Sequence, residues 1–194
     1  ISYSVTGVQT CALPIFSMGD EAVIDGFIIQ RGRRGISSSS KDFIVSNCNV
    51  SNNTEDGVRC ENGNLSISDS VICSNSWDGI YAIGSGKLLS VINCKIYGNL
   101  RDGIEAQYVT ATIKNSIIDH NGQWDENYFG LNFYNTTASS IIRNCTIAHN
   151  KAEGIKFTGS YKPDVRNNII WWNDKKGASF RSEEHTSELQ SPNT

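Results

Sequence analysis

The chain has 194 residues, 19% of them charged, and a formal net charge of -3 at pH 7. It lacks the basic stripe that marks nucleic-acid-binding proteins, so we expect no nucleic-acid partner. No apolar run approaches the ~18 residues that a transmembrane helix needs, so we expect no membrane span. The length fits a single domain.

Two segments near the ends of the chain do not fit the pattern of the rest. Val5–Ile15 reads VTGVQTCALPI, and Arg181–Ser191 reads RSEEHTSELQS. One DNA sequence that encodes the second segment has a reverse complement that encodes the first. This DNA sequence resembles a common short-read sequencing adapter. We therefore expect residues 1–16 and 181–194 to be non-native, adapter-derived segments. Residues 17–180 are then the native domain, truncated at both ends.

The first predicted strand lies in Ala22–Gly32, where Asp25-Gly26-Phe27 is followed by two isoleucines. The next segment, Arg31–Gly35, is the most basic and irregular part of the native domain. We interpret it as a solvated loop. The alternative is an anion-binding lip, because arginine side chains suit carboxylates and sulfates.

From Asn47 onward the chain repeats one motif, which is clearest at Asn93–Ile104 as NCKIYGNLRDGI. The unit begins with an Asn followed by a small residue. An aliphatic residue comes next, then a second Asn, and the unit ends with Asp-Gly and an aliphatic residue. The glycines of successive copies are about 22, 24, 27, 24 and 23 residues apart, at Gly57, Gly79, Gly103, Gly130, Gly154 and Gly177. A period of this size indicates a solenoid.

Each copy holds short alternating runs of Ile and Val separated by Asn, Gly and Asp, which predicts strands and turns rather than helices. Stacked at the strand spacing of about 4.8 Å, equivalent aliphatic residues form three inward columns. The first runs from Val45 through Ile67, Val91, Ile113 and Ile142 to Val165. The second runs from Val50 through Ile72, Ile96, Ile118 and Ile147 to Ile170, and the third holds Val58, Ile80, Ile104, Leu131 and Ile155. Three columns predict three short strands per coil.

The repeat NCxIxxN…DGI and its copies, from about Ile24 to Phe180, resemble the right-handed parallel β-helix repeat of the pectin-lyase-like superfamily. The resemblance implies an all-β, right-handed parallel β-helix solenoid of about six to seven coils. It also implies a secreted or cell-surface location. The superfamily includes polysaccharide lyases, glycoside hydrolases, epimerases, phage tail fibres and non-catalytic surface proteins, so it leaves the chemistry open.

The polar turn residues of the repeat are interpreted as structural. Asn at two coil positions should form ladders in which each side-chain amide bonds the next coil. We expect the repeat glycines at positive φ, and we interpret the acidic residues before them, such as Asp56 and Asp78, as turn formers. The cysteines Cys48, Cys94 and Cys145 share one position and lie too far apart for disulfides.

No metal ligand set is assigned. His120 and His149 should stack in neighbouring coils, with Asp119 adjacent, and paired imidazoles are ligands for transition metals. A third convincing ligand is not apparent from the sequence, so we interpret both as exposed surface residues. No other cofactor is assigned, and calcium is the one that the lyase resemblance brings into consideration.

One coil carries an insertion, GQWDENYF, between Asn121 and Gly130. Insertions in solenoids map to loops on one face, often the binding face. The predicted substrate-binding residues are outward side chains of the third strand of each coil, joined by two aromatic residues of the insertion: Arg59, Tyr81, Glu105, Trp124, Tyr128, Asn132, Tyr134 and Lys156. Aromatic faces and hydrogen-bonding groups suit a sugar chain, and the alternative is an ordinary solvated face.

The catalytic candidates are Glu105, Lys156 and Asp102. A lyase needs a base and a cation near a uronate, yet Lys156 and Arg59 lie four coil positions apart, roughly 19 Å. A glycosidase needs two carboxylates, and Glu105 has Asp102 nearby only within the turn series. The sequence therefore predicts a monomeric, carbohydrate-interacting, extracellular β-helix that binds a polysaccharide. It leaves open whether the chain belongs to a lyase or hydrolase, or to a non-catalytic, adhesin-like stalk.

The adapter assignment predicts that deleting residues 1–16 and 181–194 leaves the thermal unfolding temperature unchanged or higher, because these segments did not evolve to pack on the solenoid. Circular dichroism melts of the full and trimmed chains provide the measurement. A substantial loss of stability on deletion would show that native structure had been removed.

Overall fold

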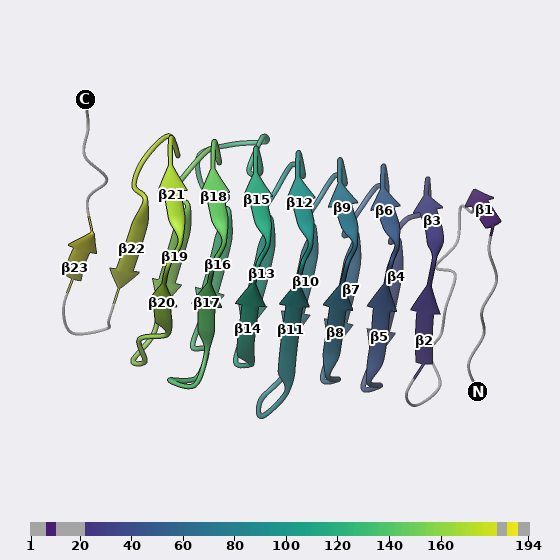
Figure 1. Ribbon diagram of the computed structural model, residues 1–194, viewed down its shortest axis with the longest axis horizontal. Coiled ribbons are helices and arrows are strands. Elements are labelled where there is room, and N and C mark those ends of the chain that lie inside the picture. The colour runs from purple at the N-terminus through teal and green to yellow at the C-terminus, as the bar shows by residue number, and fades with distance from the viewer. Residues whose placement is uncertain (1–6, 11–21, 182–185, 190–194) are drawn as a thin grey trace.

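The computed structural model describes residues 7–10, 22–181 and 186–189. In these residues the chain forms β-strands joined by short turns and contains no helix. The strands stack along one long axis as successive coils, with the N-terminal strands at one end and the C-terminal strands at the other (Figure 1). Each complete coil contributes one strand to each of three sheets.

Sheet 1 contains β1 (Gly7–Thr10), β3 (Phe27–Gln30), β6 (Asn49–Ser51), β9 (Val71–Cys73), β12 (Lys95–Tyr97), β15 (Ile117–Asp119), β18 (Thr146–Ala148) and β21 (Ile169–Trp171). Sheet 2 contains β2 (Ala22–Asp25), β5 (Phe43–Ser46), β8 (Leu65–Ser68), β11 (Leu88–Ile92), β14 (Thr110–Lys114), β17 (Ile141–Arg143) and β20 (Asp164–Arg166). Sheet 3 contains β4 (Ile36–Ser39), β7 (Val58–Glu61), β10 (Ile80–Ile83), β13 (Ile104–Gln107), β16 (Leu131–Tyr134), β19 (Ile155–Thr158), β22 (Ala178–Arg181) and β23 (Thr186–Leu189).

Neighbouring coils pair in parallel and in register throughout the repeat. In sheet 3, for example, Ile80 pairs with Val58 on one side and with Ile104 on the other. The seven strands of sheet 2 correspond to seven coils. The fold is therefore the predicted right-handed β-solenoid with three strands per coil.

The three predicted aliphatic columns form the core. Val91, Ile113 and Ile142 follow one another in sheet 2, and each is completely buried. The columns of sheets 1 and 3 have the same continuity, and only the last members of the first two columns, Val165 and Ile170, are partly exposed. Because each fully buried Ile contributes about 1.5–3 kcal/mol, these columns are the main stabilising element.

A ladder of buried amides runs through the turn after sheet 1. The Nδ2 of Asn75 donates to the Oδ1 of Asn99 at 3.0 Å, and Asn99 donates in the same way to Asn121 at 2.9 Å. The Oδ1 of Asn99 also accepts the backbone N–H of Asn75. The same pattern extends from Asn53 to Asn173, which confirms the predicted ladder.

The repeat glycines are not in the left-handed region, so the prediction of positive φ for them was wrong. The described glycines with positive φ are Gly26, Gly86, Gly98, Gly122 and Gly159. The repeat glycines serve close packing instead. A Cβ on Gly103 would lie 2.6 Å from the carbonyl oxygen of Gly130 and 2.8 Å from the Asn121 amide nitrogen. The amide ladder therefore excludes a side chain at this position.

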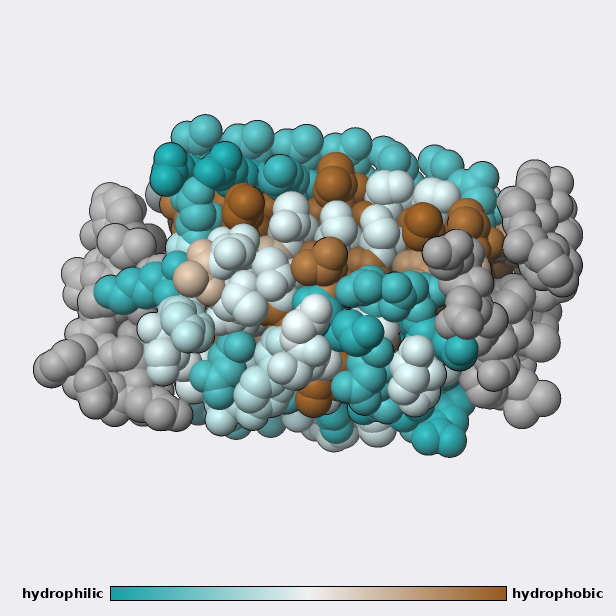
Figure 2. All heavy atoms as spheres, turned by 90° about the horizontal axis from the view of Figure 1, so that it is seen from below, coloured by the Kyte–Doolittle hydropathy of each residue, from teal (hydrophilic) through white to brown (hydrophobic). Residues whose placement is uncertain are grey.

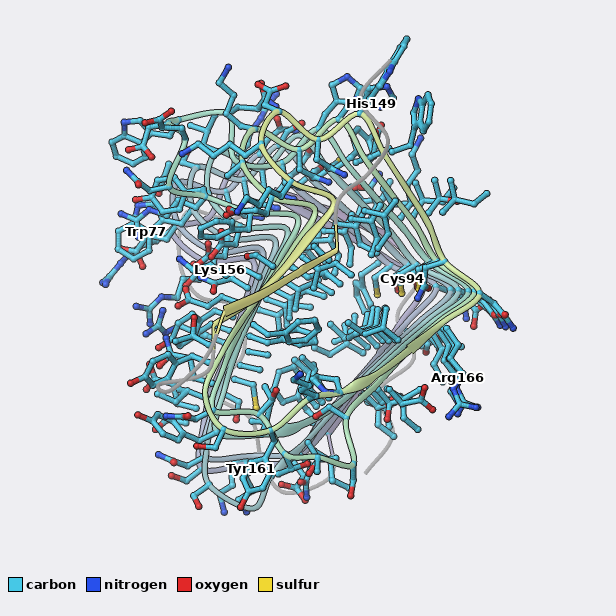
Figure 3. All side chains as sticks on the ribbon, turned by 90° about the vertical axis from the view of Figure 1, so that its left-hand side faces the viewer. Trp77, Cys94, His149, Lys156, Tyr161 and Arg166 are labelled. Atoms are coloured by element: carbon cyan, nitrogen blue, oxygen red, sulfur yellow. The ribbon has the colours of Figure 1, made fainter. Side chains whose placement is uncertain are left out.

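The cysteine position is a buried column of small residues, as predicted. Cys48, Cys94 and Cys145 alternate with Ser70 and Ser116, and the backbone N–H of Cys94 donates to the Ser116 hydroxyl at 3.1 Å. The described cysteines are all free and buried. Viewed along the axis, Cys94 lies inside the coil while Arg166 and Tyr161 lie on its outside (Figure 3).

Strands also form within the two predicted adapter-derived segments. β1 pairs in parallel with β3, and β23 pairs antiparallel with β22, unlike the strand pairs of the repeat. Any exposed strand edge accepts a further backbone, so this pairing does not decide the origin of the segments, and the adapter assignment stays a prediction. The remainder of both segments lies outside the described residues.

The face of the solenoid drawn in Figure 2 carries both polar and apolar residues. Hydrophobic residues gather in an interrupted row on one side of the solenoid, with hydrophilic residues along its border (Figure 2). No helix in the described residues has the length and apolar character needed to cross a membrane.

Replacing a ladder residue should destabilise the fold strongly. In Asn99→Ala, the backbone N–H and side-chain amide of Asn75 lose their buried acceptor, which we expect to lower the free energy of unfolding by roughly 2–4 kcal/mol. Urea unfolding provides the measurement. Asn127→Ala is the control, because Asn127 is an exposed asparagine outside the ladder. Equal stability of the two variants would contradict the role of the ladder.

Candidate functional site

The outer surface of sheet 3 carries most of the predicted site residues. In each strand, two outward-facing, partly exposed side chains alternate with two buried ones. Strand register places the first outward residues in one row, which contains Arg59, Tyr81, Glu105, Asn132 and Lys156. Tyr134 lies in the second outward row beside Gln107. We call these six predicted residues, excluding Gln107, the strip.

The charged groups of the strip are paired with neighbours. The Arg59 guanidinium contacts Asp56 at 2.9 Å and Glu61 at 2.7 Å, and it lies 4.1 Å from the ring centre of Tyr81. The Lys156 ammonium lies 4.2 Å from the ring centre of Phe129. The Gln107 amide donates to Glu105 at 2.6 Å. The strip therefore mixes aromatic surface with both signs of charge.

The insertion places Trp124 and Tyr128 around an arginine that the sequence analysis did not select. The Arg101 guanidinium lies 4.4 Å from the Trp77 ring centre, 5.4 Å from that of Trp124 and 5.6 Å from that of Tyr128. We call these four residues the Arg101 cluster. Trp77 and Lys156 lie on the same side of the coil (Figure 3).

The repeat itself carried a signal for the Arg101 cluster. Trp77, Arg101 and Tyr128 each precede the residue before the repeat glycine, so they occupy one position in successive coils. The backbone N–H of Arg101 donates to the carbonyl of Trp77, as this stacking requires. A search for cation–π neighbours along each column would have found Arg101.

The acidic residues before the repeat glycines form a buried column. Each carboxylate accepts a backbone N–H from the next coil: Asp56 accepts that of Asp78, Asp78 accepts that of Asp102, and Asp102 accepts that of Phe129. All three aspartates are buried. The carboxylates therefore join one coil to the next, and their predicted turn-forming role stays a prediction.

Burial and mutual repulsion change the acidity of this column. Burial raises the pKa of Asp102 to about 7, against hydrogen bonds from the Phe129 N–H and the Asn132 amide that lower it. Burial and the nearby Asp102 carboxylate raise the pKa of Asp78 well above its ordinary range. Burial also raises the pKa of Asp56, and the Arg59 guanidinium partly offsets this effect. Protons are therefore held in the column near neutral pH.

Three carboxylates converge where the column meets the strip. Asp78, Asp102 and Glu105 each offer an oxygen, and these oxygens lie within 4.8 Å of one another. Ca²⁺ needs room for six to eight oxygen ligands, including water. This group offers little such room, because both Asp102 oxygens already accept hydrogen bonds and the residue is only 2% exposed. Asp78, which the sequence analysis treated only as a turn former, belongs to this group.

Asp102→Asn tests the acidic column. The folded state holds a proton on Asp102 up to a pKa of about 7, above the ordinary value of 3.8. The stabilisation that this protonation provides is fully present when the pH is below the ordinary pKa, and it is lost as the pH rises toward 7. We expect the wild type to lose stability relative to the variant over this interval, by at most about 1.4 kcal/mol per pH unit.

Urea unfolding of both proteins from pH 4 to pH 8 measures this difference. Asp69→Asn is the matched control, because Asp69 is exposed and equivalent positions such as Asn93 already carry an amide. A difference between wild type and Asp102→Asn that does not vary with pH would contradict the prediction.

The chain matches one known protein family over most of its length. The family model described as "Right handed beta helix region" matches residues 56–192. No curated protein matches the chain.

Two solved structures are similar to the chain at low sequence identity. One is the crystal structure of pectate lyase Pel9A, with 16% identity over 76% of this chain and 58% of that chain, and a TM-score of 0.41. The other is the A-module of Azotobacter vinelandii mannuronan C-5 epimerase AlgE6, with 12% identity over 89% of this chain and 56% of that chain, and a TM-score of 0.44. The chain spans less than two thirds of each structure. The match of the family model over most of the chain shows that the protein belongs to the right-handed β-helix family.

Proposed function

We propose that the strip and the Arg101 cluster bind a polysaccharide whose chain runs along the solenoid axis, at the cell surface or outside the cell. The observation that carries the proposal is the in-register row of outward polar and aromatic side chains on sheet 3 beside the exposed aromatic insertion.

The shape of this surface suits a linear polymer. From Arg59 to Lys156 the row crosses five adjacent strands, each paired with the next. At the usual strand spacing this corresponds to roughly 19 Å. A flat row of this length offers contacts to several consecutive sugar units, whereas a small metabolite would need an enclosing pocket.

The chemistry of the surface also suits sugars. Trp124 and Tyr134 are 58% and 38% exposed, so each presents apolar ring surface to solvent. Flat aromatic faces pack against the apolar faces of sugar rings, while Asn132 and Gln107 offer amides to hydroxyl groups. Because Arg59 and Lys156 already contact neighbours, we propose a neutral or weakly acidic glycan rather than a densely charged one.

A second candidate function is catalysis within a polysaccharide lyase or glycoside hydrolase. The observation in its favour is that Asp102, with a pKa raised to about 7, lies close to the half-buried Glu105. A carboxyl that is protonated at neutral pH is what a general acid requires. The burial of Asp102 opposes this role, because its oxygens face protein donors rather than a substrate. Lys156 lies two strands from Glu105 and is the only other candidate that we retain.

The binding proposal predicts that Trp124→Ala combined with Tyr134→Ala weakens glycan binding. If each ring contributes about 0.5–1.5 kcal/mol, the double variant should bind roughly tenfold more weakly. Affinity electrophoresis on gels containing a neutral xylan, a sparsely charged glucuronoxylan or, for comparison, densely charged polygalacturonate provides the measurement. Trp171→Ala combined with Tyr161→Ala is the matched control, because it removes one exposed Trp on sheet 1 and one exposed Tyr in the connection after β19, neither of which belongs to the strip or the Arg101 cluster.

The outcomes separate the three functions. Loss of retardation in the Trp124/Tyr134 variant alone supports the strip, and equal loss in the control contradicts it. Release of unsaturated or reducing ends by the wild type, abolished in Glu105→Gln, would establish catalysis. Absence of binding to all three glycans would favour a structural, adhesin-like stalk.

A further inference from the structure

The bend that follows sheet 1 presents one residue in the left-handed region in successive coils. These residues are Asn52, Ser74, Gly98, His120, His149 and Trp172, with φ values between 48° and 65°. Their side chains therefore leave the backbone in the same direction and stack from coil to coil. Two neighbouring coils carry histidine at this position. His149 lies at a different corner of the coil from Trp77 and Lys156 (Figure 3).

The two imidazoles share one carboxylate. Asp119 is the last residue of β15, and its Oδ2 lies 2.8 Å from the Nδ1 of His120. Its Oδ1 lies 2.9 Å from the Nδ1 of His149, in the next coil. The two rings stack with their centres 4.8 Å apart and their planes 24° apart. One potential ligand atom of each residue lies within 4.8 Å of those of the other two.

The surroundings hold this arrangement in place and leave it accessible. The Trp172 and His149 rings meet edge to face, and their centres are 5.7 Å apart. The side-chain amide of Gln123 donates to the backbone carbonyl of His120, which fixes the adjoining turn. The side chains of His120, Asp119 and His149 are 59%, 26% and 39% exposed, so an ion can reach them from solvent.

The ligand types at this bend suit a transition metal. One carboxylate and two imidazole nitrogens face one another, with the Asp119 oxygens directed to the Nδ1 atoms of both rings. Nitrogen and oxygen donors of this kind suit Zn²⁺, Ni²⁺ and Cu²⁺. An ion among them would bind the Nδ1 atoms while each neutral ring carries its proton on Nε2, and water would fill the remaining positions.

We propose that Asp119, His120 and His149 form a binding site for one divalent transition-metal ion, separate from the strip. A convincing third ligand for the two histidines is not apparent from the sequence alone. The structure assigns that part to Asp119, whose two oxygens are directed to the two rings.

Zinc binding to the full chain, prepared without a histidine tag, tests the proposal. Isothermal titration with ZnCl₂ should show one ion per chain. His120→Asn combined with His149→Asn should weaken this binding at least about tenfold, as loss of direct ligands requires. Asparagine is chosen because Asn52 occupies the equivalent position with the same φ sign. His185→Asn is the matched control, since the sequence has three histidines in all.

A second measurement keeps the test decisive if the double variant fails to fold. Asp119→Asn preserves the size of the side chain and should also weaken zinc binding. Electron paramagnetic resonance of Cu²⁺ bound to the wild type should show coupling to two imidazole nitrogens. Zinc binding that is unchanged in Asp119→Asn or in the folded double variant would overturn the proposal. A failure of the wild type to bind either ion at millimolar concentration would also overturn it.

Discussion

The spacing between coils is the constraint on which the rest of this structure depends. Parallel strands stack at about 4.8 Å, so each residue has as its nearest axial neighbours the residues at the same position one coil away. Many buried polar groups find a partner there, which avoids the free-energy cost of leaving a buried donor or acceptor without a hydrogen bond. The amide of Asn99 meets this requirement by donating to Asn121 and accepting from Asn75. The repeat glycines follow from the same constraint, since any side chain on Gly103 would collide with Asn121.

The same spacing that favours amide ladders is unfavourable for like charges. Amides are both donors and acceptors, so a column of them is self-complementary. Carboxylates only accept when ionised, and Asp78 and Asp102 can be stacked because each also receives a backbone N–H and because protons are retained. The column ends where Phe129 replaces the acid and Lys156 covers the ring. The repeat thus raises the pKa values of a buried acidic column that meets the strip at Glu105.

Periodic features could be predicted from the sequence, and non-periodic ones could not. The three aliphatic columns and the Asn99 ladder follow from spacing alone, because stacking converts a repeat position into a contact. The φ values of the glycines were mispredicted because turn propensity does not distinguish a left-handed bend from a close approach. The packing of Trp124 against Arg101 depends on the way in which the insertion folds back over the preceding coil. No position of the repeat determines this conformation. The contact of Asp119 with two histidine rings could not be predicted from the sequence, because it depends on how a side chain at the end of a strand lies relative to two side chains at the bend.

Departures from the repeat are therefore where individual chemistry arises in this fold. A substitution on an outward position or bend leaves the aliphatic columns intact, so each corner of the coil can change without loss of the core. The insertion before Gly130 and the histidines at the sheet 1 bend are two such departures. Because each coil contacts mainly its neighbours, a new group acts with the coil above or below it. His120 gains a stacking partner only because the next coil also carries histidine, and Trp124 contacts Arg101 only because Arg101 lies one coil earlier.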